Sequence, residues 1–107
     1  MYTKEFELLW WQIQHRLRAQ PVIGNWTALK GYLGDTMKVV AVHAESIEVD
    51  APMARNLLVV PKAHFKAVWE LWPQYKNGQV QRQELTERTF YSKYIISILH
   101  WMEAEKE

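Results

Sequence analysis

The sequence predicts an α+β fold, and two observations indicate it. Apolar residues recur at helical spacing near the N-terminus and again through the last third of the 107-residue chain. Short runs rich in β-branched residues lie between these regions, too close together for the crossover helices of a parallel sheet. We therefore expect one domain, residues 1–107, with an N-terminal helix, a three-stranded antiparallel meander, and then two or three C-terminal helices.

The first helix is expected over residues 4–19. Thr3 can cap its N-terminus, the glutamates of its first turn suit the positive end of the helix dipole, and Pro21 ends it. One apolar face follows the i, i+3, i+4, i+7 rule and consists of Phe6, Leu9, Trp10, Ile13 and Leu17. Leu8 and Trp11 lie off this face, so the helix carries more apolar surface than one packing contact needs.

The stretch from Gly24 to Gly34 predicts a loop with a short turn. Helical spacing of Trp26, Leu29 and Leu33 competes there with glycines and with residues that suit an extended chain. Three strands are expected on the basis of β-branched content and alternation, and they cover Thr36–His43, Ser46–Asp50 and Leu57–Val60.

Helical patterns follow the third strand. Pro61 lies where a helix can begin, Pro73 should end or kink that helix near Leu71, and Asn77-Gly78 is a stop signal. The region from about Gln81 to Glu105 contains a last helix that is apolar nearly all round. Such a helix needs burial on more than one side.

Composition excludes several classes of protein. Thirteen Lys and Arg against twelve Asp and Glu give a net charge of +1, which does not indicate a dedicated nucleic-acid binder. The absence of cysteine excludes disulfides, thiolate nucleophiles and sulfur-ligated zinc. No signal-peptide pattern and no apolar run of about 20 residues is present, so we expect a cytoplasmic protein without membrane association.

The residues that could perform catalysis do not form a recognisable site. His100 and Glu103 share one helix turn, but two ligands are too few for a metal site. Ser97 precedes His100 by three residues, and a serine so placed more often bonds its own backbone than forms a triad. Glu48 and Asp50 share a strand face that reads as solvated. We therefore expect no enzymatic activity, no metal and no cofactor.

The aromatic content favours self-association. A chain of this length has limited interior for six Trp, and two of its helices carry surplus apolar surface. We expect a homodimeric binding or adaptor module that takes a protein partner or a small apolar ligand; a dense monomeric core is the other interpretation. The candidate interface residues are Leu8, Trp11, Tyr94, Ile98, Trp101 and Met102.

A nucleic-acid-binding accessory protein is the alternative function. Four cations between the C-terminal helices could contact phosphates, and they are Lys76, Arg82, Arg88 and Lys93. The competing interpretation is that Arg82 and Arg88 form surface ion pairs with Glu84 and Glu87 and bind no nucleic acid.

Several short segments resemble a known type of protein. The segments are Val60-Pro61-Lys62, Tyr75-Lys76-Asn77-Gly78, Ser92-Lys93-Tyr94-Ile95, Asn25-Trp26-Thr27 and Gly31-Tyr32-Leu33-Gly34-Asp35. Together they are similar to small uncharacterised bacterial proteins carried on integron gene cassettes and other mobile elements, over about residues 24–102. The resemblance implies a bacterial, mobile-genome context and a dimeric small protein. It implies no activity and no functional residue.

Overall fold

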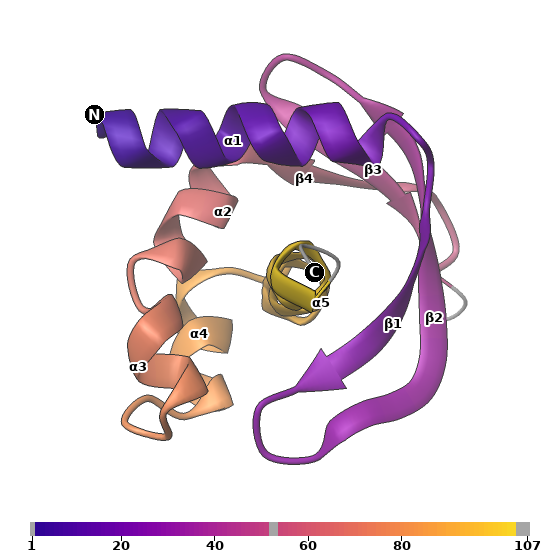
Figure 1. The fold of residues 1–107 in the computed structure, drawn as a ribbon. Coiled ribbons are helices and arrows are strands. Elements are labelled where there is room, and N and C mark those ends of the chain that lie inside the picture. The colour runs from indigo at the N-terminus through magenta and orange to yellow at the C-terminus, as the bar shows by residue number, and fades with distance from the viewer. Residues whose placement is uncertain (1, 52–53, 105–107) are drawn as a thin grey trace.

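The computed structural model describes residues 2–51 and 54–104, and its α+β architecture confirms the predicted fold class (Figure 1). A helix precedes an antiparallel sheet, and shorter helices follow it. In chain order the elements are α1 (Lys4–Leu17), β1 (Val22–Thr27), β2 (Gly31–Val42), β3 (Ser46–Asp50), β4 (Leu58–Pro61), α2 (Lys62–Trp69), α3 (Trp72–Lys76), α4 (Arg82–Arg88) and α5 (Ser92–Ala104).

Within the described residues the sheet is a meander of four strands in the order β1-β2-β3-β4, one more than the three that were predicted. The missed strand, β1, and the start of β2 occupy the stretch that was expected to be a loop. Trp26 and Tyr32 are cross-strand partners there, and Gly31 takes a φ of 72° directly after the turn. The register shifts between Gly24 and Trp26. The glycines of this stretch therefore permit a turn and a bulge within a hairpin.

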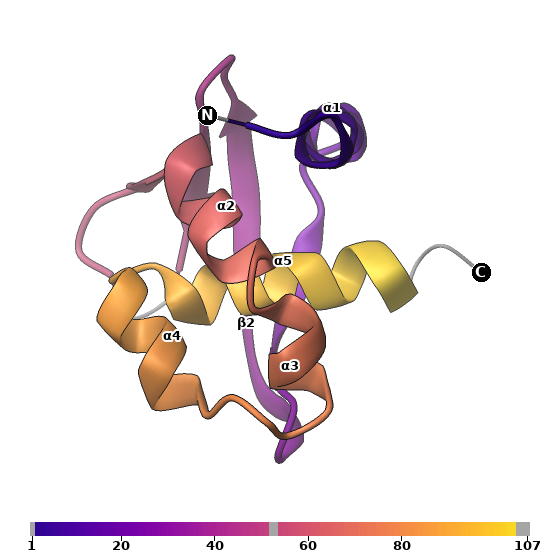
Figure 2. The same ribbon diagram turned by 90° about the vertical axis from the view of Figure 1, so that its left-hand side faces the viewer.

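Helix α5 lies at the centre of the molecule. Figure 1 looks down its axis and shows the sheet curving past it, α1 crossing above it, and α2, α3 and α4 on the remaining side; Figure 2 shows the same helix from the side. Its buried residues lie on several sides of the helix and are Ser92, Ile95, Ile96, Ser97, Ile98, Leu99 and Met102. The apolar circumference of the last helix is thus covered within a single protomer.

Four helical segments follow the sheet in the part of the chain that the structure describes, where two or three were predicted. Pro61 is the N-cap of α2 and marks its start as expected. Helix α2 ends at Trp69, close to Leu71 as Pro73 predicted, and Pro73 itself lies in the first turn of the next helix, α3. The predicted region from Gln81 to Glu105 is divided because Thr89 is extended and separates α4 from α5. Glu105 lies outside the described residues.

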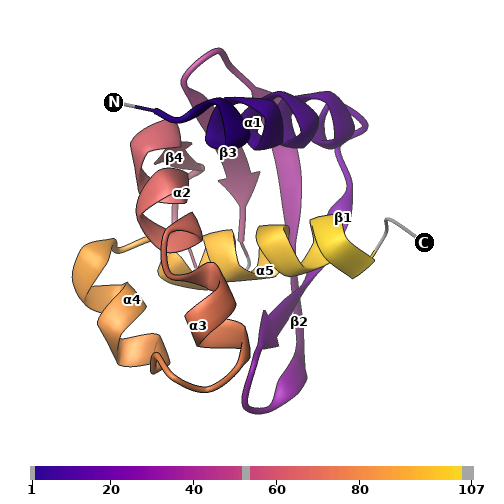
Figure 3. The ribbon, with the colours of Figure 1, turned by 60° about the vertical axis from the view of Figure 1, so that its left-hand side comes forward.

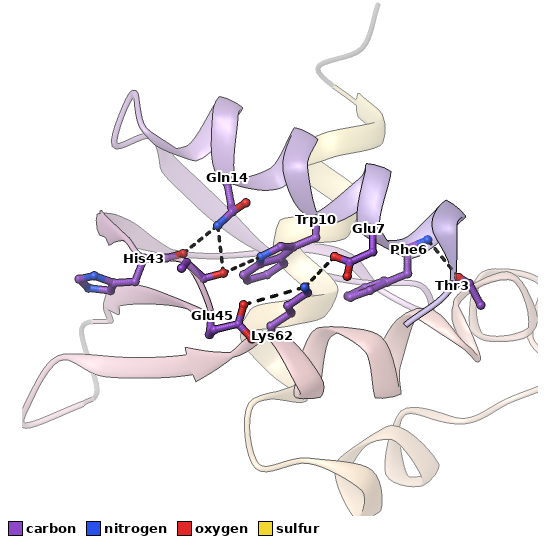
Figure 4. Close-up of polar contacts among 9 residues, drawn as sticks. Thr3, Phe6, Glu7, Trp10, Gln14, His43, Glu45 and Lys62 are labelled. Atoms are coloured by element: carbon purple, nitrogen blue, oxygen red, sulfur yellow. Dashed lines mark hydrogen bonds and ion pairs between the residues drawn. The ribbon is translucent and has the colours of Figure 1, made fainter. Parts of the chain in front are cut away.

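Polar contacts hold α1 to the sheet and to α2 (Figure 4). Thr3 caps the helix as predicted, accepting a hydrogen bond of 3.2 Å from the Phe6 amide. The indole N–H of Trp10 donates to the carbonyl of Ala44. Lys62 is buried, and its Nζ lies 2.6 Å from Oε1 of Glu7. These contacts fix α1 across one end of the core.

Candidate binding groove

An open groove of about 560 Å³ lies between the turn of the β1–β2 hairpin and the connection from α3 to α4. Both segments lie near the lower end of the molecule in Figure 3, although they are about fifty residues apart in sequence. The volume lies within the range of about 300–1,000 Å³ that is typical of ligand sites. Its apolar lining consists of Ala28, Leu29, Leu33, Tyr75 and Val80.

The hairpin wall of the groove is set by a short turn. The amide of Lys30 donates to the hydroxyl of Thr27 across 3.1 Å, and Gly31 follows with positive φ. The Tyr75 hydroxyl accepts a 3.0 Å hydrogen bond from the amide of Ala28 and so ties this turn to α3. This bond lets two distant segments share one groove.

The opposite wall begins where α3 ends. Asn77 is the C-cap of that helix, and its side-chain oxygen accepts a hydrogen bond of 3.0 Å from the amide of Gln79. Gly78 has a φ of 88°, a conformation that favours glycine. The predicted stop signal therefore forms the bend that carries Val80 to the groove.

The charge along the groove has one sign. Lys30, Lys76 and Arg82 line it, and none of the described lining residues carries a carboxylate. Lys76 bonds the Glu103 carboxylate at 2.8 Å, outside the groove lining. Lys30 and Arg82 are exposed and form no ion pair with any residue that the structure describes. The site is therefore apolar at its walls and cationic at its rim.

An aromatic stack lies beside the groove. The His100 ring lies parallel to the indole of Trp26, and its Nε2 is 3.1 Å from the Tyr32 hydroxyl. Partial burial lowers the pKa of His100, while the Glu103 carboxylate acts in the opposite direction. Glu103 in turn accepts hydrogen bonds from the Trp72 indole and from Lys76. His100 and Glu103 are thus held by different partners.

Ser97 performs a structural role that the sequence interpretation favoured. Its hydroxyl donates to the Lys93 carbonyl and accepts from the Trp26 amide at 3.0 Å, so it links α5 to β1. Next to it, Asn25 donates to Asp35, and this bond, aided by Lys93, lowers the pKa of the Asp35 carboxyl. The adjoining cavity of about 10 Å³ has room for about one water molecule.

The carboxylates that were considered for chemistry do not converge. Glu48 bonds His43 at 2.6 Å on the outer part of the sheet, and Asp50 is exposed at the end of its strand. No group of three or more metal-ligating side chains is found within residues 2–51 and 54–104.

The six candidate interface residues fall into three groups. Ile98 and Met102 are buried in the core of the protomer, where α5 is enclosed by the other elements of the same chain. Tyr94 and Trp101 are half-buried against that core. Leu8 and Trp11 leave 59% of their surface exposed on the outer side of α1.

The four candidate nucleic-acid-binding cations do not share one surface. Lys76 pairs with Glu103 near the end of α5, whereas Lys93 lies 3.5 Å from Asp35 near its beginning, ten residues or about 15 Å away along the helix. Arg88 binds Glu70 at 3.1 Å, rather than Glu87. Lys76 and Arg82 line the groove, and the other two cations do not.

The groove itself was missed by sequence reasoning. The signal that could have revealed its hairpin wall is a three-residue turn, Ala28–Lys30, followed by Gly31 and flanked by Trp26 and Tyr32. No local sequence pattern predicts that this turn lies close to the bend at Gly78. The pattern of each segment predicts only the structure of that segment.

No protein-family model, no curated protein and no solved structure matches this chain. The resemblance to gene-cassette proteins therefore stays a prediction. No helix in the described part of the chain is long and apolar enough to cross a membrane.

Proposed function

We propose that this chain is a non-enzymatic binding module whose binding surface is the groove between the β1–β2 hairpin and the α3–α4 connection. One observation carries the proposal: large aliphatic side chains stand exposed inside a groove of about 560 Å³. Leu29 leaves 88% and Leu33 43% of its surface exposed at this site. Exposed apolar groups gathered in a concavity are typical of ligand or partner sites.

The hydrogen-bonding pattern supports binding rather than catalysis. His100 is stacked on Trp26 and hydrogen-bonded to Tyr32, and the Ser97 hydroxyl is hydrogen-bonded to the Trp26 amide and the Lys93 carbonyl. The groove lining supplies lysines, an arginine and amides, which suit recognition of a charged partner.

The dye 8-anilinonaphthalene-1-sulfonate tests the proposal, because it combines an apolar ring system with an anionic group. We expect saturable fluorescence enhancement that the variants Leu29→Glu and Leu33→Glu weaken about tenfold or more, as the loss of a buried leucine contact implies. Leu8→Glu and Leu57→Glu are matched controls, since both residues are similarly exposed and lie outside the groove. Circular dichroism establishes that each variant is folded. Binding that the groove variants leave unchanged, or that the controls weaken equally, contradicts the proposal.

Self-association through α1 is a second proposal, and the exposure of Leu8 and Trp11 favours it. These residues are one helical turn apart on the outer side of α1, and the ring of His15 stacks on the Trp11 indole. The remaining members of the expected interface are buried or half-buried, so the surface available for a homodimer is smaller than the sequence indicated.

A further inference from the structure

We infer that the partner of the groove is an acidic, extended peptide segment that carries a large aliphatic side chain beside its carboxylates. The inference rests on the proposed function and specifies the chemistry of the occupant.

The positive charge of the groove favours an acidic peptide. Three cations line the groove without a lining carboxylate, although the whole chain has a net charge of only +1. Lys30 comes from the hairpin turn and Arg82 from the first turn of α4, so cations stand on both walls. A partner lying between them meets positive charge on each side, which favours carboxylates and disfavours a basic partner.

The residues that line the groove favour an aliphatic side chain on the peptide. Leu29, Leu33 and Val80 provide aliphatic surface, whereas Tyr75, the one aromatic among the described lining residues, is only 4% exposed. Nucleic-acid bases bind on exposed aromatic faces, and the groove offers none. An aliphatic side chain can pack against the leucines and lose its own water in doing so.

The openness of the groove favours a peptide over a small molecule. Sites for small ligands bury about 70–90% of the ligand surface, which requires walls that close around it. Leu29, at 88% exposure, stands at an open wall instead. A segment of chain can cover such a wall by running along it and continuing beyond both ends.

The peptide contacts the groove through side chains, because the backbone amides at the neighbouring edge of β1 already have hydrogen-bond partners. On β1 the amide of Trp26 is bonded to Ser97, and just beyond it the amide of Ala28 is bonded to Tyr75. A peptide adding as a further strand at this end of β1 would need these donors. The specificity should therefore come from the rim charges and the leucines.

Selection from a random library of dodecapeptides displayed on phage tests the inference, with affinities of the selected peptides measured by fluorescence anisotropy. We expect peptides that combine Asp or Glu with Leu, Ile or Val. The double variant Lys30→Glu, Arg82→Glu should bind them at least tenfold more weakly and should itself select basic peptides. The double variant Lys38→Glu, Arg18→Glu is the control, because both residues are exposed and lie outside the groove.

The outcomes separate this inference from the proposed function. Selected peptides without acidic residues, or acidic peptides that the control variant weakens as much as the groove variant, overturn the inference. Dye binding in the groove without any selected peptide also overturns it and leaves the groove as a site for another ligand. A labelled single-stranded RNA that binds the groove more tightly than the peptides overturns it in favour of nucleic acid. Failure of both dye and peptides to bind removes the proposed function as well.

Discussion

The imidazole of His100 lies parallel to the indole of Trp26, and their ring centroids are 3.9 Å apart. This stack joins the central helix α5 to β1 of the hairpin that forms one wall of the groove. Tyr32, the cross-strand partner of Trp26, contacts the same imidazole from β2. The position of the hairpin therefore depends on a ring whose charge can change.

The pH dependence of stability should reflect this stack. Because burial lowers the pKa of His100 below its ordinary value of 6.5, the folded state binds fewer protons there than the unfolded state. The stability contributed by neutral His100 is complete above pH 6.5 and is lost as the pH falls through the lowered pKa. Melting temperatures from about pH 7.5 to about pH 5 should fall more steeply for the wild type than for His100→Phe, which stacks without titrating. An NMR titration that places the pKa of His100 at or above its ordinary value contradicts this prediction.

Replacing Ser97 by alanine should destabilise the protein by about 1 kcal/mol or more, because the part-buried Trp26 amide loses its acceptor. Chemical denaturation measures this loss. Ser46→Ala is the control: Ser46 is half-buried and its hydroxyl makes no hydrogen bond with the described residues, so a change within about 0.5 kcal/mol is expected. Equal effects of the two substitutions would show that the Ser97 hydroxyl does not stabilise the hairpin.

Glu7→Gln should also lower stability by about 1–3 kcal/mol, since it leaves the Lys62 side chain, only 9% exposed, without its near carboxylate. Glu5→Gln is a matched control in the same helical turn, because Glu5 is in no ion pair of the described residues. It measures the effect of losing a first-turn carboxylate at the helix dipole without losing the ion pair to Lys62. The double variant Glu7→Gln, Lys62→Met should recover part of the lost stability in urea denaturation, because the buried cation that has lost its near carboxylate is gone. A double variant less stable than Glu7→Gln contradicts this account.

Sedimentation velocity over a concentration series tests self-association. A specific stable interface covers about 800 Å² on each partner, more than Leu8 and Trp11 can supply alone, so we expect a dimer that forms only as the concentration rises. Trp11→Glu should abolish it, whereas Leu29→Glu on the opposite part of the molecule should not. A strict monomer at every concentration removes the homodimer proposal.

Nucleic-acid binding, if present, should depend weakly on salt. Of the four candidate cations only Lys76 and Arg82 line the groove, where Lys30 joins them, and three phosphate contacts give a slope of log K against log salt of about −3 or shallower. Anisotropy of labelled duplex DNA and single-stranded RNA measures this slope. A steeper slope that Arg88→Ala and Lys93→Ala reduce would show that the dispersed cations act together after all.

Local patterns predicted the elements whose signals are local. Thr3 and Pro61 mark helix starts as expected, α2 ends just before Leu71 as Pro73 predicted, and the strand Ser46–Asp50 has the predicted bounds. The first strand was missed because helical spacing of Trp26, Leu29 and Leu33 competed with residues that suit an extended chain. The use of the glycines in a bulge and a turn depends on the pairing of Trp26 with Tyr32. Pairing across a hairpin is a tertiary property that propensity does not contain.

The environment of α5 shows more clearly what local sequence patterns cannot predict. The pattern indicated correctly that a helix apolar on several sides needs burial, but periodicity cannot say which surface covers it. The assignment of Ile98 and Met102 to a partner chain followed from doubt that a small protomer could enclose a whole helix. The curved sheet and three short helices do enclose it. The groove was beyond reach for the same reason, since it depends on where two distant turns meet.

The central position of α5 also has a consequence for synthesis. Every element that surrounds it precedes it in the chain, and the hydrogen bond from Arg16 to the Met102 carbonyl spans 86 positions. A nascent chain that has not yet reached Ser92 therefore lacks the helix that covers the apolar inner faces of α1 and the sheet. These faces are then exposed to other chains. Folding of this unit must wait until the ribosome has released α5, and chaperones that cover apolar surface have their longest opportunity just before then.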